Sequence, residues 1–158
     1  MIKTINDIGN IKSKIKSMLY ANGDIQHLLF NGSIPSGASK KELFNKLVKT
    51  HLFIDDTITD TGSFIYFDTS ISDLHYQTKT MRVHLYAITH RDLLDNYTHD
   101  YYVGNRADVL AEEIADTLTN EKNSNEFGIG EISLMNVDIY NSESYYGRIL
   151  TFEVKNFR

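Results

Sequence analysis

The chain has 158 residues, 41% apolar and 23% charged, which is the composition of one ordinary globular domain rather than of a disordered or fibrous chain. Its net charge of −5 argues against the broad electrostatic attraction with which proteins bind nucleic acid tightly. The absence of cysteine excludes disulfide bonds, thiol nucleophiles and zinc–thiolate sites.

No part of the sequence approaches the roughly 18 to 20 consecutive apolar residues of a membrane span, and the N-terminus lacks the apolar run of a signal peptide. We therefore expect a protein that is made in a cytoplasm and has no membrane partner.

The first third of the chain predicts helices. Apolar residues at spacings of three and four lie on one face of residues 5–20, and Asp24 can cap a short helical turn that follows. The segment 31–41, "NGSIPSGASKK", reads as an exposed loop. Residues 40–53 then predict a short amphipathic helix with Ser39 as its N-cap.

The remainder predicts strands around one long helix. A strand begins near Ser63, and residues 79–90 alternate between a core face and a wetter face. The segment 105–119 is the clearest helix, and 129–141 pairs as a strand with 144–157. This order predicts one α+β domain over residues 1–158: a largely antiparallel sheet of about four strands, packed by N-terminal helices and the long helix 105–119.

The sequence shows no constellation that points to catalysis or to metal binding. The six histidines form no HExxH or HxH motif, and adjacent carboxylates such as Asp55 and Asp56 would not converge on one centre. No serine lies in a GxSxG elbow, and the glycines do not form a phosphate-binding loop. We therefore predict no catalytic residue, no cofactor and no metal, and hence a protein that is not an enzyme.

Aromatic residues are the one compositional excess, with ten tyrosines, eight phenylalanines and no tryptophan. They cluster at residues 64–67, 101–102 and 145–146. Such clusters suit sheet cores and protein interfaces equally, and both interpretations stay open. Stacking of nucleic-acid bases is disfavoured, because it normally requires a basic groove that this acidic chain lacks.

The order and spacing of the segments in residues 61–157 resemble one known family. The resemblance rests on "TGSFIYFDTSI", "TKTMRVHLYAITHRDLL", "YVGNRADVLAEEIADTLTN" and "YYGRILTFEVKNF". In these segments the chain resembles the tail terminator, or tail completion, proteins of long-tailed bacteriophages and related prophage tails. The stretch 31–60 departs from the shortest members of that family and is an added contact element in this interpretation.

The resemblance implies a structural virion protein that assembles as a ring of identical copies, commonly a hexamer. The ring would cap the head-proximal end of the tail tube, end tail polymerisation and offer the surface for head–tail joining. The implied partners are the tail tube protein, the head-completion or connector protein and, in contractile tails, the sheath. DNA would pass through without specific binding, and assembly would take place in the cytoplasm of the host bacterium.

A closed ring requires two different, complementary patches on every copy. Candidate ring-interface residues are Tyr145, Tyr146, Arg148, Tyr101 and Tyr102. A channel that carries DNA should not bind phosphates, so an acidic lining is expected. Its candidates are Glu131, Asp138, Glu143 and Glu153, for which a solubilising role on the outer surface is the alternative.

Two other functions are compatible with the sequence. The first is another neck component, such as a head-closure adaptor, although such adaptors more often consist of short strands in barrel-like runs and lack an alanine-lined helix like that at 105–119. The second is a small enzyme of the hydrolase or nucleotide-processing kind, against which the lack of converging ionisable residues argues.

Overall fold

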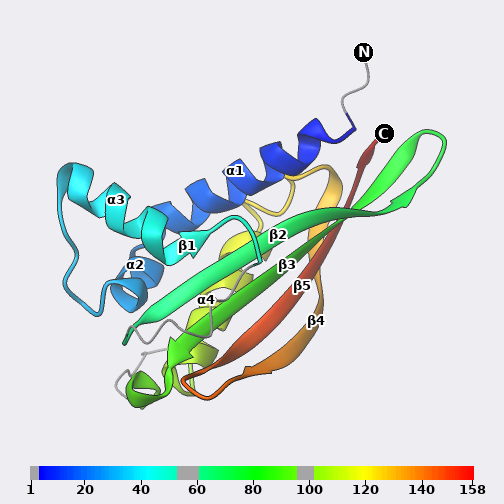
Figure 1. Cartoon of the computed structure of the whole chain (residues 1–158). Helices are drawn as coiled ribbons and strands as arrows, with labels where there is room; N and C mark the ends of the chain where they lie inside the picture. The colour runs from blue at the N-terminus through cyan, green and yellow to red at the C-terminus, as the bar shows by residue number, and fades with distance from the viewer. Residues whose placement is uncertain (1–3, 53–60, 96–101) are drawn as a thin grey trace.

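The structure is a computed structural model that describes residues 4–52, 61–95 and 102–158 (Figure 1). The elements in chain order are the helices α1 (Asn6–Ala21), α2 (Gly23–Leu29) and α3 (Gly37–Leu47), the strands β1 (Val48–Lys49), β2 (Ser63–Leu74) and β3 (Thr78–His90), the short 3-10 helix η1 (Arg91–Leu93), the helix α4 (Arg106–Thr119), and the strands β4 (Ile129–Asn141) and β5 (Tyr145–Phe157).

These elements form an α+β fold with a five-stranded sheet in the order β1-β2-β3-β5-β4. The pairs β2–β3, β3–β5 and β5–β4 are antiparallel, and only β1 pairs in parallel, with β2. The fold class predicted from the sequence is therefore confirmed. The fifth strand, β1, has just two residues, which is too short to leave a pattern in the sequence.

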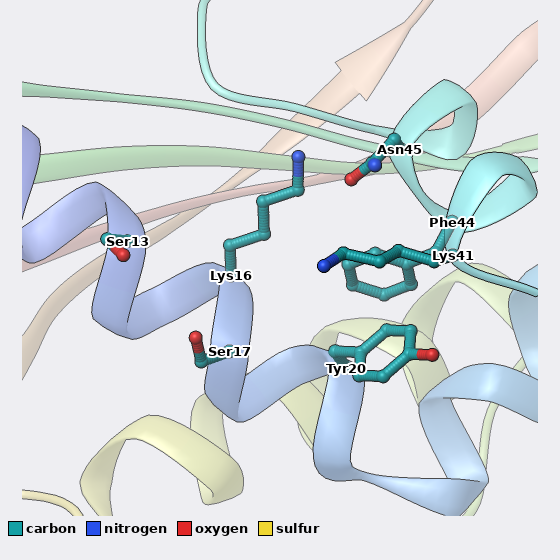
Figure 2. A pocket seen from close by; sticks show the side chains of 7 residues that line it. All are labelled: Ser13, Lys16, Ser17, Tyr20, Lys41, Phe44 and Asn45. Atoms are coloured by element: carbon teal, nitrogen blue, oxygen red, sulfur yellow. The ribbon is translucent and has the colours of Figure 1, made fainter. Parts of the chain in front are cut away.

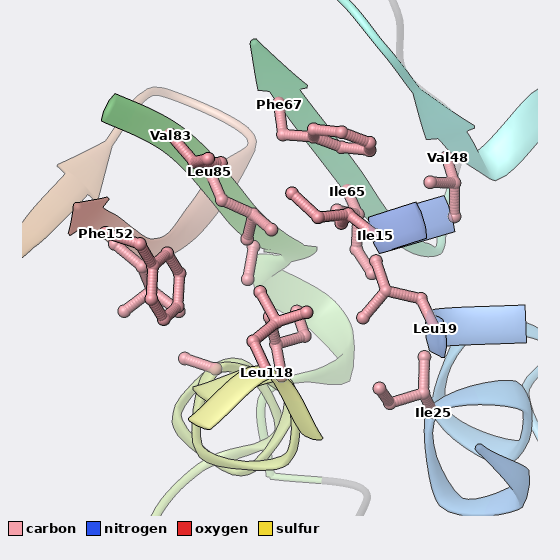
Figure 3. Packing of buried hydrophobic residues seen from close by; sticks show 14 of the residues in the cluster. Ile15, Leu19, Ile25, Val48, Ile65, Phe67, Val83, Leu85, Leu118 and Phe152 are labelled. Atoms are coloured by element: carbon pink, nitrogen blue, oxygen red, sulfur yellow. The ribbon is translucent and has the colours of Figure 1, made fainter. Parts of the chain in front are cut away.

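The helices pack on one face of the sheet, with α4 behind the strands in the view of Figure 1. Period-two alternation sends Met81, Val83, Leu85 and Ala87 of β3 into the core, where each is fully buried. Helix residues such as Ile15, Leu19 and Leu118 meet strand residues such as Phe67 and Phe152 in this cluster (Figure 3). The opposite face carries the alternate set Arg82, His84 and Tyr86, which are half-buried.

The N-caps of two helices agree and disagree, respectively, with the sequence pattern. Asn105 caps α4 by accepting a hydrogen bond from the Asp108 amide at 3.0 Å, as its position before the helix predicts. The prediction of Asp24 as a cap was wrong, because Asn22 caps α2 by accepting from the amides of Asp24 and Ile25.

The helix predicted over residues 40–53 also begins and ends elsewhere. Helix α3 begins at Gly37, so Ser36 rather than Ser39 occupies the N-cap position. It ends at Leu47, because Val48 and Lys49 pair with Ile65 and Tyr66 of β2 instead of continuing the helix. No helix among the described residues is long and apolar enough to cross a membrane.

Candidate functional site

Strand β4 forms one edge of the sheet and is the most exposed element of the described chain. One side of its backbone pairs with β5, whereas the other side has no neighbouring strand in the described residues. Only Ile132 of its thirteen residues is buried, at 3% exposure. An unpaired edge of this length presents a row of backbone donors and acceptors to which another strand can add.

The same strand exposes large apolar side chains. Met135 is 58% exposed, Val137 51% and Ile139 56%, and Leu134 is exposed as well. The strand contains no proline and no lysine, the residues with which isolated proteins commonly protect such edges. Glu131 and Asp138 are its only charged residues. We call Glu131, Leu134, Met135, Val137, Asp138 and Ile139 the β4 edge.

The β4 edge continues into a shallow depression against α4. The depression has a volume of about 140 Å³ and is lined by Ala111 and Ala115 from the helix and by Leu134 and Val137 from the strand. The small alanines predicted on this helix face do bring α4 close to the sheet, but they leave the edge strand only partly covered. An exposed apolar stripe of this kind marks a contact surface.

A second, larger hollow lies between α1 and α3 (Figure 2). It has a volume of about 630 Å³ and is lined by Ser13, Lys16, Ser17, Tyr20, Lys41, Phe44 and Asn45, which we call the lysine groove. Tyr20 and Phe44 meet edge to face there, with ring centroids 4.9 Å apart. Figure 2 shows the side chain of Lys41 passing the Phe44 ring and pointing toward Lys16, and the side chain of Lys16 extending toward Asn45.

The lysine groove has an excess of positive charge. Burial lowers the pKa of Lys16, and repulsion from Lys49 and Lys41 lowers it further. Among the described residues, Lys12 pairs with Asp68 at 2.7 Å, whereas no ion pair involves Lys16, Lys41 or Lys49. Three cations that repel one another beside aromatic rings favour an anionic partner.

The ring-interface candidates lie in different environments. Arg148 of β5 donates to Asp108 of α4 at 2.8 Å, a contact that raises the pKa of Arg148, and its guanidinium lies 5.6 Å from the ring centroid of Tyr146. These two candidates are therefore neighbours beside α4. Tyr145 is 4% exposed, and its aromatic side chain packs edge to face on Phe64. It therefore lies in a buried hydrophobic cluster within a single copy of the chain.

The two remaining tyrosine candidates, Tyr101 and Tyr102, both precede α4 in the sequence. Tyr102 donates from its hydroxyl to Asp116 at 3.2 Å. Burial, the hydrogen bond from Tyr102 to Asp116 and the nearby carboxylates raise the pKa of Tyr102 to about 12. Tyr101 lies outside the described residues.

The four acidic candidates do not form one cluster. Glu131 and Glu153 line the same shallow depression beside β5, and Glu153 pairs with Arg82 at 3.0 Å on the sheet face away from α4. Asp138 lies exposed farther along β4, next to Ile149 of β5. Glu143 lies in the turn between β4 and β5, toward the other end of these strands. If these residues line a channel, the acidic side chains come from two separate parts of the β4–β5 pair.

The exposed apolar residues of β4 are candidate contact residues that sequence reasoning missed. Their alternation with polar residues is the pattern of any half-buried strand, so it predicts burial of one face. The missing information was the position of β4 at the edge of the sheet. The nearest signal was the presence of Met135 between Leu134 and Val137, where the register of the strand shifts.

Within the part of the chain that the structure describes, no group of three or more metal-ligating side chains converges. The lysine groove and the depression beside α4 are each lined by apolar and charged side chains, a mixture that suits protein interfaces.

A family model described as YomW matches residues 13–154, a range that includes the lysine groove and all of β4. No curated protein matches the chain.

Proposed function

We propose a function from one premise: the chain belongs to the YomW family, which is phage-derived, and is a phage protein. Within that class we infer a structural role in the virion. The protein forms a ring of identical copies that caps the head-proximal end of a tail tube, ends tail polymerisation and provides the surface for head–tail joining.

The observation that carries this proposal is the β4 edge. A long unpaired strand edge with exposed Met135, Val137 and Ile139 is costly for an isolated protein, because it invites uncontrolled pairing. A closed ring solves this problem by covering the edge of every copy. The α+β protomer, with helices on one face of an antiparallel sheet, is also the architecture that the resemblance to tail terminators implies.

The partners follow from the same role. The ring contacts the tail tube protein on one side and a head-completion or connector protein on the other, with the sheath as a further partner in a contractile tail. The role requires no catalytic residue. DNA passes through the ring without specific binding.

Electron microscopy of phage particles made without this protein tests the proposal. A phage that lacks the gene is expected to assemble free tails of irregular, extended length and heads without attached tails. Restoring the gene in trans should restore uniform tails. Tails of normal length, joined to heads in the absence of the protein, would contradict the proposed role.

A further inference from the structure

The lysine groove and the β4 edge lie at opposite edges of the sheet. Strand β4 ends the strand order on one side. On the other side β1 ends it, and α3, which contributes Lys41 to the groove, leads directly into β1. Figure 1 shows α3 on the side of β1 and β2, away from β4. Because they lie at opposite edges of one sheet, the lysine groove and the β4 edge can contact each other only between different copies of the chain.

The charges of the two surfaces are complementary. The groove presents Lys16 and Lys41, with Lys49 close enough to repel Lys16. The β4 edge presents Glu131 and Asp138, and Glu112 lies on the rim of the depression beside it.

The groove stays positively charged and the β4 edge stays negatively charged when the ionisable residues around them are counted. Lys155 lies near Glu131, and Glu42 is exposed on α3 next to Lys41. Arg148 beside the β4 edge is already paired with Asp108, and Lys12 beside the groove is paired with Asp68. The groove therefore keeps an excess of cations and the β4 edge an excess of anions.

Apolar groups on the two surfaces suit each other as well. The groove is a hollow of about 630 Å³ with Tyr20 and Phe44 among its lining residues. The β4 edge exposes large apolar side chains, with Met135 the most exposed among them. Thioether and aromatic groups pack favourably, and flexible methionine fills irregular hollows.

We propose that the β4 edge of one copy docks into the lysine groove of the next copy, head to tail. The occupant of the groove is thus a second copy of this chain. The contact is heterologous, and repeating it produces a ring when the rotation closes. This inference rests on the proposed ring and identifies the two surfaces that build it. Phosphate groups of a nucleic acid would also suit lysines, but the net charge of −5 and the acidic edge of the chain itself favour self-association.

Charge reversal with complementation tests the contact. One variant carries Lys16→Glu and Lys41→Glu, and the other carries Glu131→Lys and Asp138→Lys. In each variant alone, like charges face one another across the contact, so we expect the Kd of self-association to rise about tenfold or more. An equimolar mixture restores opposite charges at every contact when the two variants alternate, so we expect assembly to return. Mass photometry over a concentration series measures all three samples.

Matched controls separate this contact from a general charge effect. Lys122→Glu and Asp73→Lys change exposed charges away from both surfaces and are expected to leave assembly unchanged. Melting temperatures of all variants within a few degrees of the parent show that the fold is intact.

The outcomes distinguish the contact from the ring. If the parent protein assembles and both charge-reversed variants assemble equally well, the proposed contact is wrong. The proposal that the protein forms a ring would then still stand. Loss of assembly without rescue in the mixture would also overturn it. Variants that self-associate normally but no longer bind tail tubes or DNA would assign the groove to that other partner. Parent protein that never assembles, alone or on tail tubes, would contradict the proposed function itself.

Discussion

The guanidinium of Arg106 is buried where α2, β2 and α4 meet. Its Nε donates to the Ser63 hydroxyl at 3.1 Å, and its Nη2 donates both to the Leu28 carbonyl and to the side-chain oxygen of Asn31. Ser63 in turn shares a hydrogen bond with Thr89 at 3.0 Å. One side chain therefore connects the loop after α2, the first turn of α4 and two strands.

Replacing this guanidinium tests its contribution to stability. Arg106→Met leaves several buried polar groups without a donor and is expected to lower the free energy of unfolding by about 3 kcal/mol. Urea denaturation measures the change. Arg158→Met at the exposed C-terminus is the control, with an expected effect of about 0.5 kcal/mol or less. Equal effects of the two substitutions would show that the buried network is not as described.

Gly147 allows β3 and β5 to approach closely. A Cβ atom at this position would lie 2.0 Å from the Ala87 carbonyl oxygen, so the backbone of one strand would have to move. Gly147→Ala is expected to destabilise the protein by roughly 1 to 3 kcal/mol. Gly9→Ala in α1 is the matched control, because nothing lies within 4 Å of the added Cβ and alanine is the better helix former. Thermal unfolding in which both variants shift alike would contradict the close approach.

The raised pKa of Tyr102 gives a prediction about pH. Because the folded state holds the phenolic proton until about pH 12, compared with 10 for a free tyrosine, Tyr102 contributes stability below pH 10 that is lost as the pH rises from 10 to 12. Asp116→Asn should move the pKa of Tyr102 down toward 10, although burial and the carboxylates of Glu112 and Glu113 remain.

NMR of ¹³C-labelled tyrosine over a pH series follows this titration directly. Glu121→Gln, in the loop after α4, removes a carboxylate that does not act on Tyr102 and is the control. A pKa of Tyr102 that stays the same in Asp116→Asn would mean that the hydrogen bond is not formed in solution.

At the scale of elements, α4 was predictable because its signals agree. The Asn105 cap, the alanines and the apolar residues at intervals of four all indicate one helix, and the structure places it at Arg106–Thr119. The end of α3 was not predictable, because it depends on pairing of Val48 and Lys49 with a strand that begins at Ser63. The position of β4 at the sheet edge is unpredictable for the same reason, since strand order is set by contacts distant in sequence.

Helix α4 offers a direct test of this packing. Ile114 is fully buried, so Ile114→Asp places an unpaired carboxylate in the core and is expected to cost roughly 3 to 5 kcal/mol, enough to unfold a marginally stable domain. Glu112→Ala on the exposed side of the same helix should leave stability nearly unchanged. Circular dichroism melting curves compare the two. A variant at position 114 that melts like the parent would show that this helix face is not in the core.

At the scale of the whole molecule, the chain is a compact α+β body with two unlike surfaces at opposite edges of its sheet. The lysine groove and the depression beside α4 are open to the surface, and the acidic candidates are dispersed along the β4–β5 pair. The sequence indicated the fold and the phage context. It did not indicate the contact surfaces, because an exposed edge strand and a central strand share one pattern, and because lysines from α1 and α3 come together only after folding.

The central claim is that copies of this chain close into a ring on one end of a tail tube. Electron microscopy of purified tail tubes mixed with the purified protein tests it most directly. We expect a ring of uniform size at the head-proximal end of each tube and none along its length or at its other end. Bare tube ends at protein concentrations well above those of the tubes would contradict it.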